Sequence, residues 1–206
     1  MADSYPMRVP RRRFFSPGQI VVLFGGSFDP PHKGHARVAR AALRQLNADF
    51  IWWLVSPQNP LKERTASDRT KRVKAAQSLA RHPKFIVSAE EEKLGTRYAV
   101  DTVRALKKAY PHVRFVWLIG ADNLADLHRW RDWQGLMAQI PLAVYPRPGY
   151  NLRALSSAAA RRFGARRLAS QNSAALAALR APFFVMLTGA QSPLASSALR
   201  RAREEN

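Results

Sequence analysis

The stretch IVVLFGGSFDPPHKGH, residues 20 to 35, decides the fold predicted for this chain. Its first five residues, Ile20 to Phe24, are apolar and rich in β-branched side chains, which is typical of a strand buried on both faces. Gly25 and Gly26 then allow backbone angles that other residues avoid, and the two prolines that follow make a rigid turn. The order of strand, glycine turn and helix start predicts a βα unit with a ligand-binding turn between its elements.

The same alternation of apolar strands and amphipathic helices continues along the chain. Further strands are predicted at residues 51–55, 85–87, 115–119, 142–145 and 183–187. The spacing of apolar residues predicts helices around residues 38–46, 73–80 and 103–110, with Ser67 as the N-cap of the second helix. Strands that alternate with helices predict an α/β fold, a doubly wound parallel sheet covered by helices on both faces.

Two regions depart from this alternation. Residues 1–18 carry three consecutive arginines and three prolines without an apolar pattern, so we predict a flexible basic tail. Residues 147–180 are rich in Ala, Arg and Ser, and the spacing of their leucines predicts one or two basic surface helices. The remaining pattern predicts a single domain over residues 19–206, which is the expected number for a chain of 206 residues.

Composition excludes several classes of protein. The chain is 47% hydrophobic, which excludes a disordered chain, and it contains no cysteine, which excludes disulfides and thiolate chemistry. The longest apolar run, residues 50–55, is far shorter than the about 20 residues that a membrane-spanning helix needs. The first fifteen residues lack the apolar stretch of a signal peptide. We therefore expect no membrane partner and a location in the cytoplasm.

The formal net charge is +20, and residues 133–203 contain ten arginines and no acidic residue. Such a charge attracts polyanions, which include nucleic acid, acidic lipid and phosphorylated small molecules. The sequence shows no signature of the common nucleic-acid-binding folds, so nucleic acid is disfavoured as a partner. A basic nucleic-acid-binding module remains the alternative from a different class, and the sequence leaves open whether the chain forms a homo-oligomer.

Two histidines mark the predicted chemistry of the turn. The helix is expected to begin near His32 to Gly34, which directs its free N–H groups and positive dipole end toward the carboxyl edge of the sheet. His32 and His35 lie three residues apart and share one face of the first helical turn, and Lys33 adds a positive charge. Imidazole N–H groups donate to phosphoryl oxygens, so the pattern predicts a phosphate site.

Other interpretations of this turn are weaker. The stretch is neither a GxxxxGK[ST] loop nor a GxGxxG turn, which disfavours a P-loop NTPase and an ordinary dinucleotide dehydrogenase. A zinc site would need further ligands, yet there is no cysteine, and His82, His112 and His128 show no ligand spacing. A glycine and proline turn with two incidental histidines is the remaining structural alternative.

The segment resembles the nucleotidyltransferase α/β-phosphodiesterase superfamily, whose signature is HxGH after a GxFDP turn, and this implies a Rossmann-like nucleotidyltransferase fold over residues 19–206. A C-terminal segment, LASSALR at 194–200, resembles that superfamily's ISSTxxR, with Ala195 in place of the first Ser. Four more segments resemble the bacterial nicotinate-nucleotide adenylyltransferases: SPQNPLK at 56–62, YAVDT at 98–102, IGADNL at 119–124 with Trp130 downstream, and YPRPGY at 145–150. YAVDT departs from the family pattern at Ala99, where Thr is usual.

The resemblance implies that the adenylyl group of ATP is transferred to nicotinate mononucleotide, which yields deamido-NAD and pyrophosphate in NAD biosynthesis. The attacking phosphate is already an anion, so the protein needs no catalytic base and must instead bring two polyanions together. Mg²⁺ carried mainly by ATP requires no dense carboxylate site, and the sequence shows no resident metal site. Another HxGH nucleotidyltransferase, for instance one that acts on phosphopantetheine, is the alternative within the superfamily.

The resemblance also implies roles for individual residues. The expected catalytic residues are His32, His35 and Arg200. The expected ATP-binding residues are Gly25, Gly26, Ser27, Phe28, Lys33, Gly120, Asp122, Ser196 and Ser197. The expected substrate-binding residues are Asn59, Lys62, Tyr98, Thr102 and Trp130.

Overall fold

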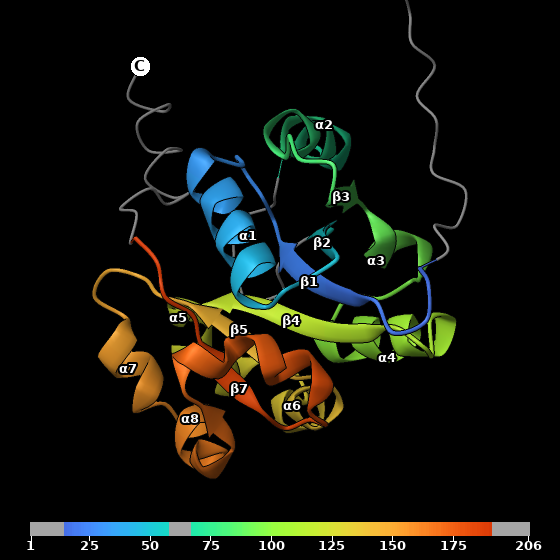
Figure 1. The fold of residues 1–206 in the computed structure, drawn as a ribbon. Helices are drawn as coiled ribbons and strands as arrows, with labels where there is room; N and C mark the ends of the chain where they lie inside the picture. The colour runs from blue at the N-terminus through green and yellow to red at the C-terminus, as the bar shows by residue number, and fades with distance from the viewer. Residues whose placement is uncertain (1–14, 58–66, 191–206) are drawn as a thin grey trace, which may run out of the picture.

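The computed structural model describes residues 15–57 and 67–190 (Figure 1). Over those residues, one sheet of seven strands runs in the order β3-β2-β1-β4-β5-β7-β6, and every neighbouring pair is parallel. The strands are β1 (Ile20–Gly26), β2 (Phe50–Val55), β3 (Phe85–Ser88), β4 (Arg114–Gly120), β5 (Leu142–Tyr145), β6 (Arg167–Leu168) and β7 (Phe184–Met186). The six strands predicted from apolar runs are confirmed, and the two-residue β6 is an addition.

Helices cover both faces of this sheet. The α-helices are α1 (Lys33–Gln45), α2 (Arg69–Leu79), α3 (Glu90–Lys93), α4 (Ala99–Ala109), α5 (Ala121–Ala125), α6 (Trp133–Gln139), α7 (Asn151–Leu155) and α8 (Ala158–Arg162). The 3₁₀ turns are η1 (Leu127–Arg129), η2 (Gly164–Arg166) and η3 (Ser170–Ala178). None of the helices in the described residues is long and apolar enough to cross a membrane.

Two apolar cores result, one on each face. Successive residues of a strand point to opposite faces, so Val21 and Leu23 join one core while Val22 and Phe24 join the other. The first core packs against α4 to α8, and the second packs against α1, α2 and η3. Figure 1 shows α1 and α4 on opposite sides of β1 and β4. The doubly wound parallel sheet predicted from the sequence is therefore confirmed.

The strand order reverses between β1 and β4. From β1 the chain builds outward through β2 to β3 on one side, and from β4 it continues through β5 on the other. Phe24 pairs with Leu118 near the carboxyl ends of the two strands. The connections that leave these two ends diverge to opposite faces, and ligands of open α/β sheets bind in the crevice at such a switch point.

Residues 147–180 correct one sequence prediction. They form the short helices α7 and α8, the turns η2 and η3, and the edge strand β6 rather than one or two surface helices alone. In η3, Leu176 is fully buried against the sheet, and the Ser173 hydroxyl donates to the Gln45 carbonyl at 2.8 Å. The alanine-rich sequence permits this close packing because small side chains let the turn approach the strands. Leu152, by contrast, is 85% exposed on α7.

The start of α2 corrects a second, smaller prediction. Asp68 is the N-cap, because its carboxylate accepts a hydrogen bond from the Lys71 N–H at 2.8 Å. Ser67, the predicted cap, instead bonds to Asp29 through both its backbone N–H and its hydroxyl. Ser and Asp are about equally good caps, so local sequence could not choose between adjacent candidates.

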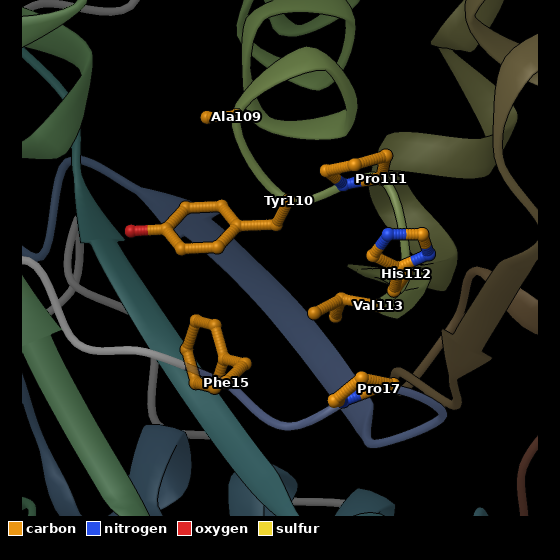
Figure 2. A pocket seen from close by; sticks show the side chains of 7 residues that line it. All are labelled: Phe15, Pro17, Ala109, Tyr110, Pro111, His112 and Val113. Atoms are coloured by element: carbon orange, nitrogen blue, oxygen red, sulfur yellow. The ribbon is translucent and has the colours of Figure 1, made fainter.

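The amino edge of the sheet corrects the predicted tail. Phe15 packs against the rings of Phe50, Trp52 and Tyr110, with centroids 5.3 to 5.7 Å apart, and the Gly18 N–H donates to the His112 carbonyl at 2.8 Å. Phe15 to Gly18 are thus attached to the domain, while residues 1–14 of the predicted tail lie outside the described residues. Figure 2 shows a pocket beside this contact, lined by Phe15, Pro17, Ala109, Tyr110, Pro111, His112 and Val113.

Candidate active site

The candidate site lies where β1 and β4 end. β1 ends in Gly25 and Gly26, and an added Cβ at Gly25 would stand 3.1 Å from the Trp117 ring. β4 ends in Gly120, where a Cβ would overlap the Asp122 carboxylate. Glycine at these two positions therefore leaves room for the Trp117 ring and the Asp122 carboxylate beside the strand ends.

The turn after β1 is anchored by Phe28. Its ring is 2% exposed and stacks on Trp53 with centroids 5.1 Å apart, and its backbone adopts a positive φ of 46°. A bulky residue in the left-handed region is strained, and burial of the ring holds it there. The Phe28 side chain is thus packed inside the protein, and its contact with ATP stays a prediction. Ser27 is half-buried beside it.

His32 and His35 lie together at the start of α1, as predicted. Their ring centroids are 3.9 Å apart. His32 is the N-cap residue, and its backbone N–H donates to His35 Nδ1 at 3.1 Å. Because Nδ1 of the neutral His35 ring accepts, the ring proton sits on Nε2, which makes Nε2 a hydrogen-bond donor. Lys33 is exposed at the first position of the helix.

His32 is buried without a hydrogen-bond partner for its ring. The residue is 8% exposed, and neither ring nitrogen makes a hydrogen bond within the described residues. Burial lowers the pKa of His32 below its ordinary value, and the nearby positive charge of Arg147 lowers that pKa further. The ring is therefore neutral at physiological pH, with one N–H to donate. A buried polar group without an internal partner is where a ligand oxygen is expected.

Asp122 and Arg147 form the opposite wall. Asp122 follows β4 at the start of α5, and Arg147 follows β5. Arg147 Nε lies 3.3 Å from Asp122 Oδ1, and the two side chains form an ion pair without a hydrogen bond. Both side chains are about one-third exposed, so they remain accessible to a ligand. The structure thus combines a carboxylate suited to ribose hydroxyls with a guanidinium suited to phosphate.

The beginning of α4 carries Tyr98 and Thr102. Tyr98 is the N-cap residue, and the Arg131 guanidinium lies 4.6 Å from the centroid of its ring. Thr102 is fully buried, and its hydroxyl bonds to the Tyr98 carbonyl and to Glu91, both at 3.2 Å. The Thr102 side chain therefore stabilises the start of α4 from inside the protein, and its contact with the substrate stays a prediction.

Trp130 ends η1 on the same face of the sheet as α4. It is half-buried and packs against the apolar core of that face. Trp133, three residues on, is also half-buried and meets Phe163 edge to face with centroids 6.1 Å apart. Trp133 therefore has an aromatic partner in the core of this face.

The other predicted site residues lie outside the described residues: Asn59, Lys62, Ser196, Ser197 and Arg200. Within the described residues, no group of three or more His, Cys, Asp or Glu side chains is arranged to hold a metal ion.

Three charged residues were missed by residue-level analysis of the sequence. Arg147 was quoted only as part of the YPRPGY segment, and its position after a strand was the signal that could have identified it. Arg72 and Glu91 are 3% and 5% exposed and lie near the predicted substrate segments. Both lie in charged stretches that predict solvated helix faces, so only the tertiary structure reveals their burial.

Comparison with known proteins identifies the family to which this chain belongs. The family model described as cytidylyltransferase-like matches residues 23–202. A "probable nicotinate-nucleotide adenylyltransferase" of Ruegeria sp. (strain TM1040) is 45% identical over 181 residues, which cover 88% of this chain and 96% of that protein. One from Cereibacter sphaeroides (strain ATCC 17025) is 47% identical with the same coverage. The chain belongs to the cytidylyltransferase-like family, and within it to the nicotinate-nucleotide adenylyltransferases.

Solved structures agree with the observed architecture. The nicotinic acid mononucleotide adenylyltransferase of Plasmodium falciparum, in complex with NaAD, aligns with a TM-score of 0.64. The alignment covers 89% of this chain and 83% of that one at 15% sequence identity. At this identity the likeness concerns the fold alone, and it confirms the Rossmann-like nucleotidyltransferase fold.

Proposed function

We propose that this protein transfers the adenylyl group of ATP to nicotinate mononucleotide and releases pyrophosphate, a reaction of NAD biosynthesis. The observation that carries the proposal is the His32–His35 pair at the start of α1, beside the point where the connections after β1 and β4 diverge. Membership of the nicotinate-nucleotide adenylyltransferase family supports the identity of both substrates. ATP is an intracellular substrate, so the proposal includes the cytoplasm as the place of action.

The reaction needs little covalent participation from the protein. An oxygen of the mononucleotide 5′-phosphate attacks the α-phosphorus of ATP, and the bond from that phosphorus to the β-phosphate oxygen breaks. The electron pair leaves with pyrophosphate, and no proton has to move because the nucleophile is already an anion. Catalysis therefore rests on alignment of two polyanions and on donors aimed at the oxygens where charge grows.

The ATP side of the site lies at the start of α1. His35 Nε2 donates to an α-phosphoryl oxygen, and the neutral His32 ring supplies a second donor that has no hydrogen-bond partner in the described residues. The free N–H groups and positive dipole of α1 add to this field. Gly120 and Asp122 receive the adenosine ribose. Ser196, Ser197 and Arg200 complete the phosphate site in this proposal, as predicted from the sequence.

The mononucleotide side lies at the start of α4. Ala99 and Val100 are the first two residues of that helix, whose first N–H groups have no acceptor within the helix. These donors favour the carboxylate of nicotinate over the amide of nicotinamide, since an amide offers fewer acceptor lone pairs and presents an NH₂ group. The rings of Tyr98 and Trp130 provide faces for the pyridine, and Asn59 and Lys62 are proposed to contact the rest of the mononucleotide.

Mg²⁺ enters this proposal as part of the ATP complex. The described part of the site is lined by imidazole and guanidinium groups with Asp122 as its carboxylate, and Asp122 already faces Arg147. Such a donor set fits a metal held by the triphosphate and water rather than a resident ion. When bound, Mg²⁺ neutralises triphosphate charge, while the histidines and the N-terminus of α1 orient the phosphates.

The proposal is tested by pyrophosphate release from purified protein with ATP and nicotinate mononucleotide. The expected result is rapid release, with a product whose mass equals that of deamido-NAD. The panel replaces nicotinate mononucleotide by nicotinamide mononucleotide or 4′-phosphopantetheine, and ATP by CTP. A better rate with phosphopantetheine or CTP would assign the protein to another nucleotidyltransferase activity, and no turnover with any pair would refute the proposal.

A further inference from the structure

Arg72 makes an unusual set of contacts inside the domain. It lies in the first turn of α2 and is 3% exposed. Its guanidinium donates four hydrogen bonds, all to backbone carbonyls: Nε to Ser67 at 2.8 Å, Nη1 to Ser27 at 2.7 Å and to Ser56 at 2.8 Å, and Nη2 to Pro57 at 3.0 Å. A buried charge costs free energy, and these bonds to carbonyl dipoles offset that cost.

The four carbonyls belong to the segments on which the proposed reaction depends. Ser27 lies in the turn between β1 and the histidine pair. Ser56 and Pro57 come directly after β2, and Ser67 precedes Asp68, the N-cap of α2. Pro57 and Ser67 flank the stretch that carries Asn59 and Lys62, the residues predicted to contact the mononucleotide. One guanidinium thus joins the turn after β1 to the described residues on either side of residues 58–66, which themselves lie outside the described residues.

A second link connects the same two segments. The Asp29 carboxylate, in the turn after Ser27, accepts from the Ser67 N–H at 3.0 Å and from the Ser67 hydroxyl at 2.6 Å. The turn after β1 is also held by the sheet at one end and by α1 at the other. The segment after β2 leaves the sheet at Val55 and is held at Pro57 and Ser67 by these links.

We propose that Arg72 is a positioning residue for adenylyl transfer. Together with the Asp29–Ser67 contact, it fixes Ser56, Pro57 and Ser67 relative to the turn that leads to the histidine pair. This inference rests on the proposed function and adds a residue to it. In-line attack is sensitive to placement, and a displacement of about 1 Å costs about 10²-fold in rate. Lysine cannot replace Arg72. The ammonium of lysine is a single point of charge, whereas the planar guanidinium of Arg72 reaches the turn after β1, the end of β2 and the residues before α2.

The test is steady-state kinetics of Arg72→Lys with ATP and nicotinate mononucleotide. We expect kcat to fall by about 10²-fold and the KM for the mononucleotide to rise, while the KM for ATP stays within about twofold, since the sheet and α1 still hold the ATP-side turn. Arg81→Lys is the matched control, because Arg81 makes the same kind of bond to a carbonyl, at Ser78, but is exposed at the far end of α2. This control is expected to behave as wild type.

A double-mutant cycle separates positioning from a general loss of structure. If Arg72 acts by aligning the substrate with the histidine pair, Arg72→Lys should cost much less in a His35→Ala background than in wild type. A purely structural role would give equal losses in both backgrounds, and that result would overturn the proposal. Equal rises in the KM for ATP and for the mononucleotide would overturn it as well.

Ser67→Ala keeps the proposal testable if Arg72→Lys does not fold. Ser67 is exposed, and the substitution removes only the hydroxyl bond to Asp29, so a folded protein is expected. The expected change is a rise of about threefold in the KM for the mononucleotide with an unchanged KM for ATP. An unchanged mononucleotide KM would overturn the proposal. An inactive wild type would instead refute the proposed function, so the two failures are distinguishable.

Discussion

The carboxyl and amino edges of the sheet differ in the contacts that their side chains make. At the carboxyl edge, the ring nitrogens of His32 are buried without hydrogen-bond partners in the described residues, and Asp122 meets Arg147 only as an ion pair. At the amino edge, Phe15 and Tyr110 pack ring against ring, as Figure 2 shows beside the pocket. The difference indicates that one edge keeps polar groups for a ligand while the other stabilises the fold.

The largest expected effect is at the carboxyl edge. His35→Ala should lower kcat by about 10²-fold or more, because a preorganised donor to the transferring phosphate is lost. The melting temperature should change little, since His35 is only half-buried. The measurement is pyrophosphate release at saturating substrates, with His112→Ala at the amino edge as the control. Wild-type turnover in His35→Ala would show that His35 does not take part in catalysis.

The buried carboxyl of Glu91 is expected to make the stability of the protein depend on pH. Burial raises the pKa of this carboxyl to about 7, although its bond from Thr102 opposes the rise, and Oε2 has no hydrogen-bond partner in the described residues. Between its ordinary pKa of 4.5 and about 7, the folded protein keeps the proton that the unfolded chain has lost. The free energy of unfolding therefore falls by about 3 kcal/mol as pH rises through this window. Above the window, Glu91 causes no further change in stability with pH.

Chemical denaturation between pH 4.5 and 8 checks this expectation. Glu91→Gln should remove the decline, because an amide does not titrate. Glu92→Gln is the matched control, since Glu92 is exposed and pairs only at the surface with Arg69. The same decline in Glu91→Gln as in wild type would show that Glu91 is not the group responsible.

Trp130 is expected to give the next largest effect. Trp130→Ala should weaken use of both nicotinate and nicotinamide mononucleotide by roughly 1 to 3 kcal/mol, the scale of stacking between a base and an aromatic ring. The ratio between the two substrates should stay nearly constant, because stacking does not distinguish a carboxylate from an amide. Trp133→Ala, which loses contact with Phe163, should affect stability rather than substrate use. A changed substrate ratio would place Trp130 in acid recognition.

Much of the fold was predictable from sequence because parallel strands are buried on both faces and appear as short apolar runs. The turn containing His32 and His35 was predictable because glycines, prolines and a helix start have strong local signals. Its approach to Gly120 and Asp122 also followed, since carboxyl ends of parallel strands meet at one edge.

Other features of the structure could not be predicted, because they depend on packing between segments that are distant in the sequence. Nothing in the sequence distinguishes Arg72 from its exposed neighbours in α2, or Glu91 from the adjacent glutamates, because burial is decided by segments distant in the chain. Phe15 stands beside arginines and prolines, which favoured a tail, yet its partners Phe50 and Tyr110 come from two other elements. Residues 147–180 lacked a sustained apolar period, so their short helices and the strand β6 could not be delimited.

The smallest expected effect tests the amino edge. Phe15→Ala removes a half-buried ring from contacts with Phe50, Trp52 and Tyr110, and should lower the free energy of unfolding by about 1 to 2 kcal/mol. Thermal unfolding provides the measurement, and Leu152→Ala is the matched control because that side chain is 85% exposed. Turnover with saturating ATP and nicotinate mononucleotide should stay at the wild-type value, since the ring lies at the opposite edge from the histidine pair. A Phe15→Ala protein that lost turnover while keeping its melting temperature would mean that the amino edge communicates with the site, and the division of roles between the two edges would be wrong.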